Sequence, residues 1–264
     1  MNIPFTKLHG AHNDFLLTRI EHAPEEDLLP EIAVAICHRY TGVGADGWML
    51  IDTSPTGECD ATIRLFNSDG SEPELSGNGT RCAAALIARE RPELTEFRIL
   101  TGAGLKHLKL ISSDELEFLF EMNMGHVEVV DRNANVQGLD AILVNPGNPQ
   151  CAFPVEDFDF DWPALGEAAE FDEMFPDRTN VSFFKRVDEH TIEARFWERG
   201  AGETMSSGTG SAGAAKAALE LGWVSDPVTV MTSAGPLWLR MAEDESILLT
   251  GPSAFVADGE FYLP

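Results

Sequence analysis

The sequence predicts a mixed α/β fold, of the α+β type, built from two homologous domains. Short runs with β-like patterning dominate the chain, and a few helical patterns interrupt them. A Ser-Gly-x-Gly turn that runs into a helix-forming segment also occurs twice, at "SGNGTRC" from Ser76 and at "SGTGSAG" from Ser207. Their spacing is close to half of the 264 residues, which two homologous domains explain better than a solenoid of short repeats.

The expected strands are separated by turn formers such as "NSDGSEP", "SSD" and "AEDE". Most of them are rich in β-branched, aromatic or other large apolar residues. They cover residues 15–20, 47–51, 61–66, 97–102, 105–111 and 116–124 in the first half, and 141–147, 181–187, 190–198, 228–242 and 246–252 in the second.

Helical patterns are fewer and cover residues 27–40, 79–90, 161–170 and 208–222. The two that follow the Ser-Gly-x-Gly turns are small and apolar nearly all round, so each should lie inside its domain with strands around it. The acidic segment 155–162 alternates Phe with Asp, which predicts an edge strand or a loop packed on one side.

Charge and hydropathy exclude several classes of partner. With 44 acidic and 18 basic residues the formal charge is -26, which repels nucleic acid and anionic membranes and favours solubility over adaptation to salt. No stretch approaches the roughly 20 apolar residues that span a bilayer, and the first ten residues lack the apolar core of a signal peptide. We therefore expect a cytoplasmic protein.

The four cysteines have neither a CxxC pattern nor a Cys/His spacing typical of zinc, so no metal site is predicted. In a chain of this length they are expected to be buried thiols and not a disulfide framework. They are Cys37, Cys59, Cys82 and Cys151.

The repeated turn has the properties of an anion site. A Gly-x-Gly turn directs backbone N–H groups outward without Cβ obstruction, and these N–H groups meet the positive end of the following helix. Two such turns, with Ser76 on one side and Ser207 on the other, could hold one small carboxylate or phosphate between them. An enzyme that removes a proton from one face of a carbon and returns one to the other needs such a geometry.

Seven segments, in order along the whole chain, resemble the diaminopimelate epimerase family. The segment "ERGAGET" before the second turn is highly specific to it. The seven are "HNDF" (12–15), "GVGADG" (42–47), "FNSDGSEPELSGNGTRC" (66–82), "NPGNPQC" (145–151), "RTNVSF" (178–183), "ERGAGETMSSGTGS" (198–211) and the terminal "LTGPSAFV".

The resemblance implies two similar α/β domains related by a pseudo-two-fold axis, each a mixed barrel-like sheet around a central helix. We expect an N-terminal domain over 1–124, a C-terminal domain over 125–254, and a last strand at about 255–264 that returns to the first domain. The resemblance places the active site in the cleft between them and leaves a homodimer open.

The function implied by the resemblance is inversion at an α-carbon without pyridoxal phosphate or any other cofactor. It interconverts the LL and meso forms of 2,6-diaminopimelate, an amino dicarboxylate of lysine and peptidoglycan synthesis. Glu198 would assist one proton-transfer group. Substrate binding is implied for Asn13, Asn67, Asn148, Asn180 and Arg199, with the N–H groups around Gly77, Asn78, Gly208 and Thr209 cradling the reacting carboxylate.

The chain departs from the family pattern at four positions. Ser76 and Ser207 stand where the family has its acid and base cysteines, Gln150 stands in place of a histidine, and Gly47 in place of a common glutamine. A thiol ionises far more readily than an alcohol. Three readings stay open: an epimerase with serines as unusual acid and base groups, a relative with another isomerisation, and a small-molecule-binding or engineered inactive form. Asp46, in the turn before Gly47, is expected to brace its loop.

Overall fold

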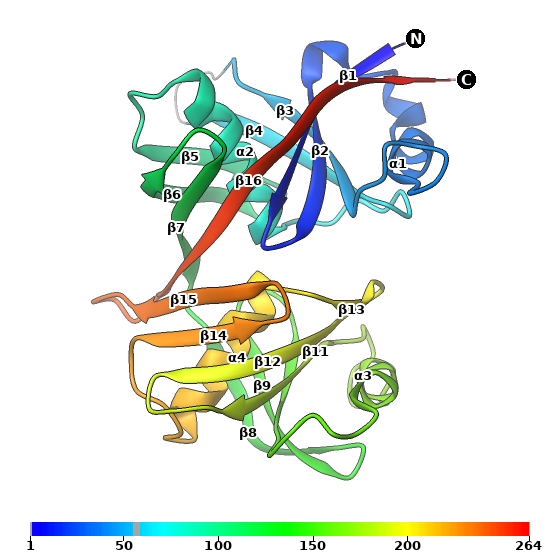
Figure 1. Ribbon diagram of the computed structural model, residues 1–264. Coiled ribbons are helices and arrows are strands. Elements are labelled where there is room, and N and C mark those ends of the chain that lie inside the picture. Colours follow the sequence, from blue (N-terminus) through cyan, green and yellow to red (C-terminus); the bar gives the residue numbers. More distant parts are fainter. Residues whose placement is uncertain (1, 55–58, 264) are drawn as a thin grey trace. The chain divides into compact units, whose positions relative to one another are not determined.

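The structure is a computed structural model that describes residues 2–54 and 59–263 of the chain (Figure 1). Contacts divide the chain into two compact units, and each is considered by itself. Unit 1 comprises Met1–Met122 and Gly251–Pro264, and unit 2 comprises Asn123–Thr250. The final segment of the chain therefore belongs to the same unit as the first, although residue 264 lies outside the described residues.

Unit 1 contains a closed barrel of eight strands in the order β1-β2-β3-β4-β5-β6-β7-β16, which β16 closes by pairing with β1. The pairs β2–β3 and β4–β5 are parallel. Parallel neighbours need a crossover connection, and a helix supplies it in both cases. The strands are β1 (Asn2–Gly10), β2 (Asn13–Arg19), β3 (Gly47–Asp52), β4 (Ala61–Asn67), β5 (Glu96–Thr101), β6 (Gly104–Ser113), β7 (Glu117–Gly125) and β16 (Ile247–Tyr262), the last two shared with unit 2 by sequence.

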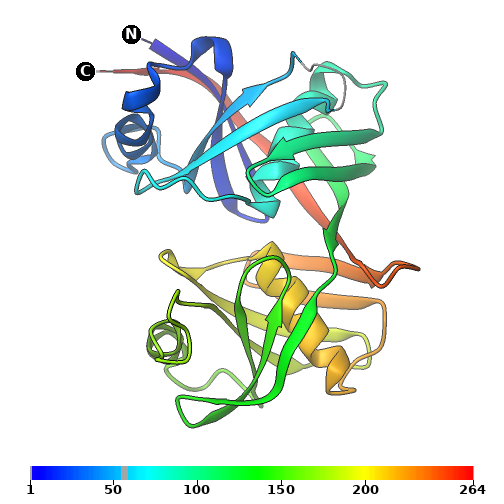
Figure 2. The same cartoon turned by 180° about the vertical axis from the view of Figure 1, so that it is seen from behind.

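The helix α2 (Gly77–Glu90) lies inside this barrel (Figures 1 and 2). Its first twelve residues are all buried, because they are small or apolar apart from Asn78, Thr80 and Arg81. The helix α1 (Leu29–Cys37) packs against β3 and β4 with its apolar face. Two short 3₁₀ helices precede it, η1 (Ile20–His22) and η2 (Glu26–Leu28).

Unit 2 has strands in the order β8-β9-β10-β11-β12-β14-β15-β16, and the short β13 pairs with β12. They are β8 (Glu128–Val136), β9 (Leu139–Asn145), β10 (Gln150–Pro154), β11 (Asn180–Arg186), β12 (Thr191–Glu198), β13 (Gly202–Thr204), β14 (Val228–Thr232) and β15 (Gly235–Met241). The central helix α4 (Gly208–Glu220) contacts six of these strands, and α3 (Trp162–Glu170) packs on β11, β12 and β13. Figure 2 shows α4 with the strands of its unit around it.

The two units repeat one topology. In unit 1, α1 connects the parallel pair β2–β3 and α2 connects the parallel pair β4–β5. In unit 2, α3 connects the parallel pair β10–β11 and α4 connects the parallel pair β12–β14. The strands between these pairs are antiparallel in both units. The internal repeat expected from the sequence, and the mixed barrel-like sheet around a central helix that the resemblance implies, are confirmed.

All four expected helices and all expected strands occur, with different ends. The run 228–242 is a hairpin of two strands, β14 and β15. The helix expected over 27–40 ends at Cys37, because the side chain of His38 accepts hydrogen bonds from the N–H groups of Tyr40 and Thr41 and turns the chain. The acidic segment 155–162 is mainly a loop, in which Phe158 packs on the core of unit 2, so the loop alternative holds.

Four strands are not predicted by the sequence: β1, β8, β10 and β13. The sequence of β8 is "EVVDRNANV", in which polar residues do not alternate regularly with apolar residues as in a typical half-buried strand. Bulges also interrupt its pairing with β9. β13 has three residues. Among the helices of the described residues, none is long and apolar enough to cross a membrane.

Candidate active site

The helices α2 and α4 begin in the same way. Ser76 and Ser207 are the N-cap residues, with backbone φ and ψ of -129° and 117° at Ser76 and of -132° and 125° at Ser207. The Oγ atom of each serine accepts a hydrogen bond from the N–H group three residues later, of Gly79 or of Gly210, over 3.1 Å in both cases. The two predicted turns are therefore one structural motif that occurs in both units.

This capping leaves backbone donors at both helix starts. The first N–H groups of a helix have no partner within the helix, and each serine side chain satisfies only the third. The N–H groups of Gly77 and Asn78 in unit 1, and of Gly208 and Thr209 in unit 2, remain at the positive end of the helix. Each helix start can therefore receive an oxygen of an anion, as the sequence predicts.

Ser207 has a carboxylate partner. Its hydroxyl donates to Oε2 of Glu198 over 2.9 Å, and Thr204 donates to Oε1 of the same carboxylate over 2.7 Å. Glu198 is the last residue of β12, and Thr204 is the last residue of β13, which pairs with it. Ser207 is buried, with 3% of its surface exposed, whereas Glu198 is half-buried. The sheet thus fixes a carboxylate next to the hydroxyl, in the position of a proton acceptor.

Gln150 occupies the position that the resemblance assigns to a histidine. It is the first residue of β10, is buried with 2% exposure, and donates from Nε2 to Asn148 over 2.9 Å and to Thr209 over 3.2 Å. Its Oε1 atom is buried and has no hydrogen-bond partner among the described residues. Gln150 therefore joins Asn148 and Thr209 into one cluster, but its amide cannot take up a proton.

Asn13 and Asn78 meet in unit 1. The side chain of Asn78 donates to Oδ1 of Asn13 over 3.3 Å, and Asn13 in turn donates to Oδ2 of Asp46 over 2.7 Å. At its other end, Oδ1 of Asn78 accepts a hydrogen bond from Nη2 of Arg81. β2 supplies Asn13 and α2 supplies Asn78, so the fold brings together two residues that are far apart in sequence.

Asp46 braces its loop, as expected. Its carboxylate also accepts from the N–H group of Asp14 over 3.1 Å, and Arg39 bridges Asp46 and Asp14 over 2.7 and 2.9 Å. Lys7 lies 2.9 Å from Asp14. Burial would raise the pKa of the Asp14 carboxyl, but hydrogen bonds from Arg39 and Lys7 outweigh it and hold that pKa below its usual value.

Asn67 is held in a turn. Its N–H group donates to the carbonyl of Ser71 over 2.8 Å, and its side-chain amide donates to Oγ of Ser71 over 3.0 Å. Gly70 closes the same turn with a φ of 85°, a value that favours glycine. The side chain of Asn67 thus shapes the loop that leads to Ser76.

Asn180 and Arg199 lie side by side in unit 2. Oδ1 of Asn180 accepts from the backbone N–H of Arg199 over 3.1 Å, and its amide donates to the carbonyl of Pro149 over 3.0 Å. The exposed guanidinium of Arg199 donates to the carbonyl of Asp177 over 3.0 Å. Asn180 is therefore a brace for the backbone at Arg199, and it also ties this backbone to the segment that carries Asn148.

Glu170 supports the same region from α3. Its side chain is 4% exposed and accepts hydrogen bonds from the indole of Trp197 over 2.8 Å and from the N–H of Gly200 over 3.0 Å. Arg178 lies 3.4 Å from it. No motif in the sequence singles out Glu170, because a Glu at the end of an amphipathic helix looks like a solvated residue.

Gly47 leaves no room for a side chain. A Cβ atom at this position would lie 2.9 Å from the carbonyl oxygen of Phe66 and 3.1 Å from the side chain of Leu65. Where the resemblance leads us to expect a glutamine, β3 and β4 therefore pack too closely for any side chain.

The four cysteines are free thiols, of which Cys37, Cys82 and Cys151 are buried and Cys59 is half-buried. Burial raises the pKa of Cys37 and of Cys82 to about 12, and it also raises the pKa of the Cys151 thiol. The expectation of buried thiols holds for these three. None of the three is activated as a nucleophile or base in place of the missing cysteines.

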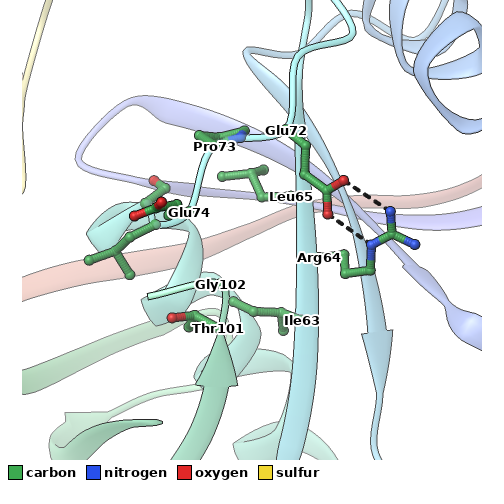
Figure 3. A pocket seen from close by; sticks show the side chains of 10 residues that line it. Ile63, Arg64, Leu65, Glu72, Pro73, Glu74, Thr101 and Gly102 are labelled. Atoms are coloured by element: carbon green, nitrogen blue, oxygen red, sulfur yellow. Dashed lines mark hydrogen bonds and ion pairs between the residues drawn. The ribbon is translucent and has the colours of Figure 1, made fainter. Parts of the chain in front are cut away.

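A pocket of about 220 Å³ lies in unit 1 beside the loop that ends at Ser76 (Figure 3). Ile63 and Leu65 of β4 and Thr101 of β5 form its wall, and the loop 72–76 forms its rim. Figure 3 shows Glu72 holding Arg64 through two hydrogen bonds, of 2.8 and 3.0 Å. The loop that positions Ser76 is thus fixed on the barrel at its start.

Solved structures with this fold include isomerases. A phenazine biosynthesis protein of the PhzF family from Bacillus anthracis has a TM-score of 0.72 at 16% identity, with 100% of both chains covered. A hydroxyproline epimerase from Agrobacterium vitis, with bound trans-4-OH-L-proline, has a TM-score of 0.69 at 14% identity and covers 98% of this chain and 90% of its own. At these identities the likeness shows the fold alone, which is the epimerase and PhzF type.

Sequence comparison then shows the family. The model of diaminopimelate epimerase matches residues 5–130 and 142–256. A diaminopimelate epimerase from Microcystis aeruginosa is 36% identical over 278 residues, which cover 98% of this chain and 99% of that protein. The chain therefore belongs to the diaminopimelate epimerase family, a family of isomerases, as the resemblance of its motifs implies.

Proposed function

We propose that this chain inverts the α-carbon of LL-2,6-diaminopimelate to give the meso form, without pyridoxal phosphate, in lysine and peptidoglycan synthesis. The observation that carries the proposal is the pair of matched helix starts, in which a serine hydroxyl caps the first turn and one of the two hydroxyls is bonded to a carboxylate. Membership in the family supports the class of reaction.

In the proposed reaction the N–H groups at the two helix starts bind the reacting carboxylate. Gly77 and Asn78 supply them in unit 1, and Gly208 and Thr209 supply them in unit 2. When the α-proton leaves, the electron pair of the broken C–H bond moves into this carboxylate, which gains negative charge. Donors that already point at the oxygen atoms stabilise that charge without reorganisation.

The proton is removed and returned by the two serines. For one direction of turnover, Ser207 accepts the α-proton as its own hydroxyl proton passes to Glu198, and Ser76 delivers a proton to the opposite face. The substrate loses one proton and gains one, so its composition does not change. Glu198 ends protonated and neutral, and the oxygen of Ser76 ends with the negative charge. An alcohol acts as a base only when a neighbouring group accepts its own proton. The Glu198 carboxylate, 2.9 Å from Ser207 Oγ, is such a proton acceptor.

The remaining predicted residues recognise or position the substrate. We assign Asn13 and Asn148 to its polar groups and Arg199 to the distal carboxylate, since a guanidinium binds a carboxylate with two charge-assisted hydrogen bonds. Asn67 and Asn180 act through the turns that they brace. The exposed guanidinium of Arg199 has only one N–H group bonded to Asp177, so donors remain for a ligand.

A second candidate is a family member with another isomerase reaction, or a relative that binds a small molecule with little turnover. Gln150 favours it, because a buried amide with an unpartnered Oε1 replaces a proton-carrying histidine. A substrate that offers a donor at that point would satisfy Oε1. A hydroxyproline epimerase with the same fold contains bound trans-4-OH-L-proline, so this fold also accommodates another amino acid.

The test is proton NMR of LL-2,6-diaminopimelate incubated with the protein in deuterated buffer. We expect the α-proton signal to disappear while the meso isomer forms. Absence of exchange, with binding still detected by calorimetry, would reject the epimerase and favour the second candidate. Exchange of trans-4-OH-L-proline, but not of diaminopimelate, would identify a different isomerase.

A further inference from the structure

We propose that Arg81 is a positioning residue, which fixes the side-chain amides of Asn78 and Asn13 so that both present N–H groups to the substrate. The inference rests on the proposed function in one respect, since that function assigns Asn13, and the start of α2 at Asn78, to the substrate. The orientation of the two amides is a property of unit 1 alone and can be measured without a substrate.

Arg81 is an unusual residue for the inside of a barrel. It is completely buried in α2 and forms no ion pair with a carboxylate of the described residues. Nε donates to the carbonyl of Pro252 in β16 over 3.3 Å, and Nη2 donates to Oδ1 of Asn78. Burial lowers the pKa of Arg81 to about 10, so its guanidinium still carries a charge at neutral pH.

One nitrogen of this guanidinium is free. Nη1 is buried and has no hydrogen-bond partner among the described residues. It lies 4.0 Å from the place that a Cβ atom on Gly77 would take, which puts the unpaired donor next to the first residue of α2. An unpaired buried donor is costly unless a ligand or a bound water satisfies it. The helix start of unit 1 thus combines backbone donors with an uncompensated positive charge.

The ends of the hydrogen-bond chain determine the direction of its amides. Arginine can only donate, so Asn78 must turn its Oδ1 atom toward Arg81 and its amide nitrogen toward Asn13. The Asp46 carboxylate can only accept, so Asn13 must turn its amide nitrogen toward Asp46. Each –NH₂ group has two hydrogens, and the chain uses one of them. The second hydrogen of each remains for a carboxylate of the substrate.

Unit 2 lacks this cation. At the position of α4 that corresponds to Arg81, 131 residues further along the chain, the residue is Ala212, and a carboxylate, Glu198, is bonded to Ser207 instead. The two halves thus differ in charge although they share a backbone motif. Unit 1 is suited to receive an anion, and unit 2 is suited to accept a proton.

The first experiment measures the side-chain amide signals of Asn13 and Asn78 by ¹H–¹⁵N NMR in the free protein. Arg81→Met keeps an apolar chain of similar length and removes the donors. We expect the Asn13 signals to shift as well as those of Asn78, although Asn13 does not contact Arg81. Arg89→Met, on the exposed last turn of α2, is the matched control and should leave both unchanged. Unchanged Asn13 signals in folded Arg81→Met would overturn the proposal.

Asp46→Ala tests the chain from the other end and decides the matter if Arg81→Met does not fold. It removes the acceptor of Asn13, and we expect the Asn78 signals to shift. If a folded Asp46→Ala variant leaves the Asn78 signals in place, the chain does not transmit orientation, and the proposal fails.

The second experiment measures the affinity for LL-2,6-diaminopimelate by calorimetry. Loss of oriented, charge-assisted donors should raise the Kd of Arg81→Met at least about tenfold, with Arg89→Met unchanged. A wild-type protein that neither binds nor exchanges this substrate refutes the proposed function, whereas the amide signals still test Arg81. Normal affinity in Arg81→Met would mean that Arg81 only supports the fold.

Discussion

Oγ of Ser207 donates a 2.9 Å hydrogen bond to Oε2 of Glu198, whereas the hydroxyl of Ser76 has no carboxylate acceptor among the described residues. The two serines cap their helices with the same geometry and nevertheless differ in chemistry. Glu198 can draw the proton from Ser207 while that oxygen takes one from a substrate, and Ser76 lacks such help. The unit 2 serine is therefore the better base of the two.

Replacing Glu198 with Gln should lower kcat for α-proton exchange about 100-fold or more, because an amide cannot accept the proton of Ser207. KM should change little, since the amide can still accept from one of the two hydroxyls, of Thr204 or Ser207, and donate to the other. Both constants are measured from the rate at which the α-proton exchanges with deuterated solvent. Glu203→Gln, in the neighbouring strand β13, is the control. An unchanged kcat would mean that Glu198 orients Ser207 without taking its proton.

Restoring both thiols, as Ser76→Cys together with Ser207→Cys, should raise the rate of inversion strongly. A thiol ionises near pH 8.5 and needs far less activation than an alcohol. The pH–rate profile should also acquire a rising limb that reports thiol ionisation. Ser113→Cys, exposed at the end of β6, serves as control. A rate equal to that of the parent would show that positions 76 and 207 do not carry the protons.

Much of the fold and of the candidate site could be predicted from the sequence, because the turns, the helix starts and the order of motifs are local patterns. The roles of the polar residues between them could not. The glycine-rich turn predicts Asp46 as a brace, but the link from Asp46 through Asn13 and Asn78 to Arg81 joins a loop, β2 and α2. An Arg directly before the run of small and apolar residues in α2 is the available signal. Glu170 gave none, because burial at a helix end depends on what the rest of the fold places over it.

Replacing the N-cap Ser76 with Ala should lower the free energy of unfolding by about 1 kcal/mol, and Ser207→Ala should cost more because it also removes the hydrogen bond to Glu198. Each Oγ satisfies one helical N–H at 3.1 Å, and alanine leaves that donor unsatisfied. The two effects should add, because the serines lie in separate units. Urea unfolding measures the loss. Asp at position 76 can cap its helix and should recover most of the stability there, whereas Ser207→Asp would place a second carboxylate beside Glu198. Equal losses in Ser76→Asp and Ser76→Ala would exclude the capping explanation.

Acid should weaken the network around Asp14. Its pKa is lowered in the folded protein, so its contribution to stability is full above the unfolded value of 3.8 and is lost as the pH falls through the lower folded value. Asp14→Asn should therefore cost about 2 kcal/mol at neutral pH and show a shallower acid limb. Urea unfolding between pH 7 and strongly acidic pH compares it with Asp27→Asn, an exposed control in η2. Parallel profiles for the parent and Asp14→Asn would contradict the assignment.

Replacing Arg199 with Ala should weaken the binding of LL-2,6-diaminopimelate about 10- to 100-fold, because a carboxylate loses its charged donor. L-Lysine, which lacks the distal carboxylate, should bind equally to the parent and the variant, and this difference separates recognition from general damage. Calorimetry gives both constants, and Arg186→Ala, exposed at the end of β11, is the control. The backbone at position 199 stays bonded to Asn180 through its N–H group, so the loop should persist in the variant. A loss of affinity shared equally by lysine would assign Arg199 to the loop and not to the distal carboxylate.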